Sequence, residues 1–201
     1  MNKQNVHILY TPFTGVGLHG GFRGNEWLKH RIEIFKNYTL KSLLNQSNRD
    51  FIHWFSFRKE EEQNYHVMKL AAYLASLEYR FIFTFDNLMY HDDKFTNYTA
   101  KTAIHNCLMM LRDCLKNKEW KNPIEIIKLT WENKNKTLPE RLKSSIHHIK
   151  KSIGDNYEWV YLTRIDSDDM FHKEATNLIQ SQEPEYRKAL VFEDGYIYNV
   201  N

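Results

Sequence analysis

Short apolar segments alternate along this chain with longer segments of helical periodicity. The short segments are rich in strand-forming residues and cover 6–11, 51–57, 80–85 and 158–165. The helical segments carry apolar side chains at every third or fourth position and cover 26–46, 65–77, 97–118 and 172–180. Strands separated by a helix are typical of a parallel sheet, because a parallel connection has to cross the sheet. The sequence therefore predicts an α/β fold with a mostly parallel central sheet flanked by helices.

Capping and turn residues mark several boundaries of these segments. Asn25 is the expected N-cap of the first helix. A further helix opens at the capping-box pattern 137–140 and ends at Gly154. Residues 124–131 alternate like an edge strand, and 189–199 contain a hairpin-turn signal at 193–195.

The length and the residue usage fit one intracellular domain. The 201 residues can bury the core of a single domain, so we expect 1–201 to form one unit. The apolar runs are shorter than the roughly 18 to 20 residues that cross a bilayer, and the first residues lack a secretory signal pattern. Cys107 and Cys114 lie two helical turns apart, too far for a disulfide within that helix, which favours free thiols. A cytoplasmic location follows as an expectation.

Positive charge is concentrated in the middle of the chain. The formal net charge is only +3, which argues against a dedicated nucleic-acid-binding protein. Residues 101–151 hold 12 basic and 5 acidic residues, a local net charge of +7. This stretch is either a solvated helical face or a surface that meets an anionic partner, such as a membrane to which the protein binds peripherally or a phosphorylated acceptor.

The strongest chemical motif follows the strand predicted at 158–165. Three carboxylates, Asp166, Asp168 and Asp169, stand within four residues. They would repel one another without a counter-charge. Ligands of open α/β sheets bind beyond the carboxyl ends of the strands, and hard oxygen donors select Mg²⁺ or Mn²⁺. The motif predicts a metal and phosphate site, whereas N-capping of the next helix would need only one aspartate.

Five of the seven glycines lie within ten residues after the first strand. Residues 15–20 spell G-x-G-x-x-G, the dinucleotide-binding fingerprint. The fingerprint should open directly into a helix and be followed by an acidic residue after the second strand, yet further glycines interrupt it and the second strand ends at Arg58. A loop that lies against a ligand is the better interpretation, and an NAD(P)-dependent oxidoreductase is the less favoured one.

Several of these patterns together resemble a known enzyme family. The matching residues are Trp27, Leu28, Arg31 and Phe35, then Ser42, Leu43 and Gln46, then Phe51 and Trp54, and finally Thr163-Arg164-Ile165-Asp166-Ser167-Asp168-Asp169. They resemble the rhamnosyltransferase family of nucleotide-sugar-dependent glycosyltransferases, which have the GT-A fold. The match covers both ends of the chain better than residues 86–155, and Lys41 stands where that family tends to have proline.

The resemblance implies a hexosyltransferase that uses a nucleoside-diphosphate sugar as donor and a glycan or lipid-linked acceptor. It implies that Mn²⁺ or Mg²⁺ is held by Asp166, Asp168 and Asp169. The nucleotide-sugar-binding residues that it implies are Thr11, Arg31, Asp86, Arg164 and Asp166.

The sequence does not identify the general base that the transfer reaction would need. Weak candidates beyond the acidic motif are Glu193 and Asp194, which more plainly shape a turn. The short sequence after the motif indicates either a minimal transferase or a chain that lacks a C-terminal acceptor-binding part. A non-catalytic module that binds carbohydrate or metal is the alternative function.

Overall fold

The computed structural model describes residues 4–14, 24–86, 100–116, 131, 140, 142–154 and 156–185. Its strands are β1 (Gln4–Pro12), β2 (Ile52–Arg58), β3 (Phe81–Asp86) and β4 (Tyr157–Arg164). Its α-helices are α1 (Asn25–Ile34), α2 (Leu40–Leu44), α3 (Tyr65–Ser76), α4 (Ala100–Lys116), α7 (Lys143–Ile153) and α8 (Ala175–Gln180). Two short helices complete this part of the chain, the π-helix η1 (Phe35–Thr39) and the 3-10 helix η2 (Lys59–Glu61).

The described strands form one four-stranded sheet in the order β3-β2-β1-β4. Each neighbouring pair is parallel. The register aligns Tyr10 with Trp54 on one side and with Arg164 on the other. The predicted α/β fold with a mostly parallel sheet is confirmed for this part of the chain.

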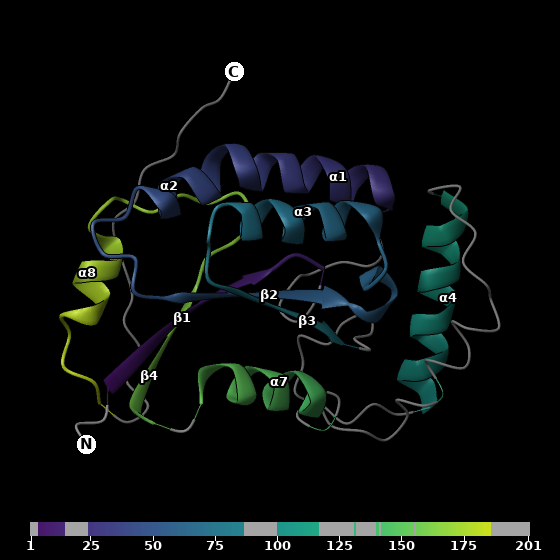
Figure 1. The fold of residues 1–201 in the computed structure, drawn as a ribbon. Helices are drawn as coiled ribbons and strands as arrows, with labels where there is room; N and C mark the ends of the chain where they lie inside the picture. The colour runs from purple at the N-terminus through teal and green to yellow at the C-terminus, as the bar shows by residue number, and fades with distance from the viewer. Residues whose placement is uncertain are drawn as a thin grey trace.

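Helices cover both faces of the sheet (Figure 1). Helices α1 and α3 lie on one face, where the spacing of Leu28, Ile32 and Phe35 turns one side of the helix inward. Helix α7 lies on the opposite face, where Ile149 packs in a smaller cluster with Ile8 and Ile82. The aromatic side chains of alternate strand residues, such as Phe55 and Phe57, fill the larger core under α1 and α3.

The helix predicted at 26–46 is continuous but not uniform. A π-helical turn at Phe35–Thr39 joins α1 to α2, and propensity alone does not reveal such a turn. The N-cap is Gly24, with φ of 87°, rather than the expected Asn25. Asn25 is the first helical residue, and its side-chain oxygen accepts a hydrogen bond of 2.6 Å from Asn64. Glycine suits this cap because its backbone adopts positive φ without strain.

Helix α7 ends as the sequence predicts, whereas β4 differs from its prediction. Gly154 caps α7 with φ of 78°. The apolar segment 158–165 predicts a buried strand, and this is wrong for one face of β4, where Val160 is 53% exposed and Leu162 is 61% exposed. The cause is that β4 alternates between a half-buried and an exposed side, as a strand at the edge of the described sheet can do. Helix α8 begins at Ala175, three residues later than predicted.

Other expectations fall outside the described residues. These are the glycine loop at 15–23, the capping box at 137–139 and the hairpin at 189–199. Of the edge strand expected at 124–131, only Trp131 is described, and it is helical rather than extended. Cys107 is a free, half-buried cysteine. In the described part of the chain, no helix combines the length and the apolar character needed to cross a bilayer.

Candidate functional site

The strand order creates a switch point between β1 and β4. The connections from β1 to β2 and from β2 to β3 carry α1 and α3 on one face, whereas the segment entering β4 carries α7 on the other face (Figure 1). Chain segments leaving two such neighbouring strands diverge, and ligands of open α/β sheets bind in the crevice beyond the carboxyl ends at this point. Phe13 and Thr14 follow β1 there, and 165–169 follow β4. The acidic motif therefore lies at the edge where such folds bind ligands.

Two arginines supply the counter-charge that the acidic motif requires. Arg31 of α1 donates two hydrogen bonds of 2.6 Å to the two carboxylate oxygens of Asp168, and its Nε donates a third, also of 2.6 Å, to the Ser167 hydroxyl. Arg164 at the end of β4 pairs with Asp166, with Nε and Oδ1 2.9 Å apart. Four predicted site residues thus come together as two ion pairs.

The position of Arg31 follows from the periodicity of α1. Arg31 lies four residues after Trp27, on the same side of the helix, and its guanidinium carbon is 6.0 Å from the centre of the Trp27 ring. Its side chain is only 19% exposed, compared with 45% for Asp168. A bidentate arginine in a partly buried position holds the loop after β4 against α1.

Asp169, the third carboxylate of the motif, belongs to neither of these two ion pairs. Burial raises its pKa above the usual range, and the neighbouring charges of Asp168 and Asp166 raise it further. The backbone N–H of Asp169 donates to the Asp166 carbonyl over 3.1 Å, which closes the turn. The like charges of this turn are therefore only partly compensated.

The carboxylates do not form a ready metal site as they stand. No group of three potential metal ligands converges within the described ranges. Both oxygens of Asp168 already accept from Arg31, and Asp166 accepts from Arg164. The donor chemistry suits Mg²⁺ or Mn²⁺, but the arrangement does not fit a bound ion.

Thr11 is buried beneath the acidic turn and holds its backbone in place, and its side chain is not exposed to a ligand. Its side chain is fully buried, and its hydroxyl donates to the Ile165 carbonyl over 2.8 Å. The same hydroxyl lies 2.8 Å from Nε2 of His53, whose Nδ1 lies 3.0 Å from the Tyr79 hydroxyl. Because Thr11 donates to the carbonyl, Nε2 of His53 carries the proton and Nδ1 accepts from Tyr79. This chain of hydrogen bonds fixes the peptide group directly before Asp166.

The environment of His53 keeps its ring neutral. Complete burial lowers its pKa to about 3. The donor and acceptor order deduced above therefore holds through the neutral pH range.

Asp86 ends β3 at the same carboxyl edge, three strand spacings from β4. That separation is about 14 Å across the sheet. Asp86 is buried, which raises its pKa, and it accepts a hydrogen bond from the Ser145 hydroxyl of α7. In the described part of the chain, its other oxygen, Oδ1, has no hydrogen-bond partner. A buried acceptor of this kind needs an explanation, and a ligand donor is one.

A buried polar cluster at the ends of β1 and β2 was missed by sequence reasoning. Arg58, Glu61 and Thr14 are each less than a tenth exposed. Arg58 donates through Nε to the Thr14 carbonyl over 3.1 Å, and the Thr14 hydroxyl donates to Glu61. The available signal was a charged residue, Arg58, directly after the apolar run 51–57. The cluster holds Thr14, the last described residue before the glycine-rich segment, and brings a third arginine to the carboxyl edge.

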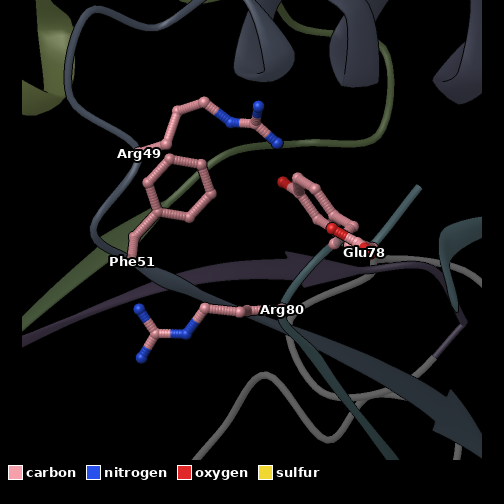
Figure 2. A pocket seen from close by; sticks show the side chains of 5 residues that line it. Arg49, Phe51, Glu78 and Arg80 are labelled. Carbon is pink, nitrogen blue, oxygen red and sulfur yellow. The ribbon is translucent and has the colours of Figure 1, made fainter.

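The described residues also line a cavity of about 220 Å³ at the opposite edge of the sheet (Figure 2). Arg49, Phe51, Glu78 and Arg80 line it together with Tyr79. Arg80 is already paired with Asp50 over 2.8 Å. The cavity lies at the amino ends of β2 and β3 and so does not belong to the acidic motif.

Glu193 and Asp194, the weak candidates for the general base, lie outside the described residues. Comparisons with models of known protein families, with curated proteins and with solved structures found no match for this chain.

Proposed function

We propose that this chain is a cytoplasmic glycosyltransferase with a GT-A-like fold that binds a nucleoside-diphosphate sugar at the carboxyl edge of its sheet. The observation that carries the proposal is the pairing of Arg31 and Arg164 with the acidic turn after β4, at the switch point of a parallel sheet. The family resemblance of the same residues supports it.

In this proposal the two arginines bind the diphosphate. Arginine contacts phosphate oxygens bidentately, and a diphosphate carries more negative charge than one carboxylate. Arg31 would exchange Asp168 for a phosphate group, while its contact with Trp27 keeps its guanidinium in place. The positive charge then stabilises the negative charge that develops on the leaving nucleoside diphosphate when the sugar is transferred.

Asp86 is the proposed contact for the base or ribose. Its Oδ1 atom is buried and has no hydrogen-bond partner within the described segments, so it can accept from a ligand N–H or O–H group. Thr11, which the resemblance implies as a nucleotide-sugar-binding residue, has a supporting role in this proposal. Its hydroxyl holds the Ile165 carbonyl and so orients the turn that carries Asp166.

The divalent cation implied by the resemblance is a separate part of the proposal, and no step above depends on it. The carboxylates as paired do not fit an ion, so the implied ligands Asp166, Asp168 and Asp169 could hold one only where phosphate has replaced Asp168 and Asp166 on the two arginines. The ion would then add positive charge beside the diphosphate. If an ion takes part, Mn²⁺ tightens nucleotide binding and Asp168→Ala abolishes that gain. If Asp168 acts only by competing with the phosphate for Arg31, the Asp168→Ala substitution tightens nucleotide binding in the absence of metal.

Turnover separates an enzyme from a binding module. The chain is incubated with a panel of UDP-, GDP- and dTDP-sugars, and the released nucleoside diphosphate is measured. We expect release from at least one donor and a loss of about tenfold or more in Arg31→Gln, because a hydrogen bond to a charged group contributes about 1.5–3 kcal/mol. Arg80→Gln is the matched control, since this arginine forms an exposed ion pair at the opposite edge.

Two results would count against the proposal. Binding of a nucleotide sugar without release on prolonged incubation would favour the non-catalytic carbohydrate-binding module. A melting temperature raised by NAD(P) and unchanged by nucleotide sugars would favour the oxidoreductase.

A further inference from the structure

Helix α4 exposes an apolar stripe that the proposed function does not use. Ile104, Leu108 and Leu115 are 59%, 62% and 58% exposed. They fall within about 40° of one another around the helix axis. In Figure 1, α4 stands to one side of the sheet and covers neither of its faces. A stripe of this kind on a soluble helix marks an interaction surface.

Basic residues border this stripe on one side. Lys101, Arg112 and Lys116 are exposed. Around the helix axis they lie about 60° to 120° from Ile104, next to the stripe. The helix therefore presents an apolar stripe and positive charge side by side.

We propose that this side of α4 binds the surface of an anionic lipid bilayer. The apolar stripe enters the boundary between headgroups and acyl chains, and the flanking lysines contact lipid phosphates. Exposed lysines of α7, namely Lys143, Lys150 and Lys151, add to the positive charge of the same stretch of sequence. The inference does not rest on the proposed sugar transfer.

Two other occupants fit the surface less well. A second copy of the chain, packed through the same stripe, would bring the uniformly basic flanks of two helices together, and like charges repel. A phosphorylated soluble acceptor would use the positive charge but leave the apolar stripe in water. A bilayer with anionic headgroups matches both features.

The test is sedimentation of the full chain with vesicles made of equal parts phosphatidylcholine and phosphatidylglycerol, compared with vesicles of phosphatidylcholine alone. We expect binding to the anionic vesicles that weakens with added salt. The triple variant Ile104→Gln, Leu108→Gln, Leu115→Gln loses at least about tenfold in affinity, because the stripe no longer gains from leaving water.

The double variant Lys101→Gln, Lys116→Gln loses about 25-fold, since each basic residue near an anionic surface contributes about 1 kcal/mol, or about fivefold. The matched control is Met68→Gln with Lys69→Gln on α3, which removes an equally exposed apolar side chain and an adjacent lysine from another surface. The control binds as the unchanged chain does. Far-UV circular dichroism checks that every variant is folded.

Three results would overturn the inference. The first is no binding to the anionic vesicles, and the second is undiminished binding by the triple variant. The third is a dimer of the unchanged chain, detected by light scattering, that the triple variant dissolves. That result would assign the stripe to a second copy of the chain.

Discussion

The same substitution at two buried threonines should have opposite effects on stability. Thr11 and Thr39 are both completely buried. The Thr11 hydroxyl has two partners, His53 and the Ile165 carbonyl, whereas in the described part of the chain the Thr39 hydroxyl has no hydrogen-bond partner. Valine keeps the shape of threonine, so neither change opens a cavity. The comparison therefore isolates the hydrogen bonds.

The magnitudes follow from the groups left behind. Thr11→Val leaves the His53 N–H and the Ile165 carbonyl without their partner in a buried place, and each such group costs about 1–3 kcal/mol. We expect the free energy of unfolding to fall by about 2–6 kcal/mol. Thr39→Val removes a buried hydroxyl without a hydrogen bond, so the free energy of unfolding should stay the same or rise by up to about 1 kcal/mol.

Urea unfolding followed by tryptophan fluorescence measures both variants. A loss of about 2–6 kcal/mol lowers the urea midpoint by at least about 0.7 M, at a slope of about 1–3 kcal/mol/M. Equal effects of the two substitutions, or a larger loss in Thr39→Val, would refute the hydrogen-bond account of Thr11. The nucleotide affinity of Thr11→Val should also fall, because the turn that begins at Ile165 loses its anchor.

Two further predictions concern acid and backbone strain. Burial lowers the pKa of His7 to about 4 and that of His53 to about 3. Both rings are held neutral in the folded chain, so their contribution to stability is present above about pH 6.5, the ordinary histidine pKa, and is lost progressively as the pH falls from there towards these values. Acidification from about pH 7.5 to about pH 4.5 should cost about 2–3 kcal/mol per histidine. A flat stability profile over that range, measured by urea unfolding at each pH, would contradict this. Gly154→Ala should destabilise by about 1–3 kcal/mol in thermal unfolding through backbone strain alone, because φ is +78° and nothing lies within 4 Å of an added Cβ; an unchanged melting temperature would show that the helix end relaxes at no cost.

The fold was predictable because each element carries its own local signal. Alternating strand and helix periodicity predicted every described strand, and the end of α7 was predicted from Gly154. The π-helical turn at Phe35–Thr39 was missed, since it leaves no clear trace in periodicity. The exposed face of β4 was missed because the sequence pattern of an apolar strand does not show whether another part of the protein covers each of its faces.

The candidate site was predictable in its residues but not in its pairings. The clustered aspartates required a counter-charge, yet Arg31 lies 137 residues before Asp168 and no local pattern joins them. The resemblance implied Thr11 as a ligand contact, whereas the hydroxyl of Thr11 is buried and donates to the Ile165 carbonyl. Contacts between distant segments depend on packing, which the sequence pattern alone does not show.

Isothermal titration of UDP, GDP and dTDP tests the central claim most directly. The unchanged chain should bind at least one of these nucleotides, and Arg31→Gln and Arg164→Gln should each weaken that binding by about tenfold or more, while Arg80→Gln should not. The prediction applies without metal and with Mn²⁺. Absence of binding in both conditions, or equal affinity in all three variants, would contradict a nucleotide site at the carboxyl edge of the sheet.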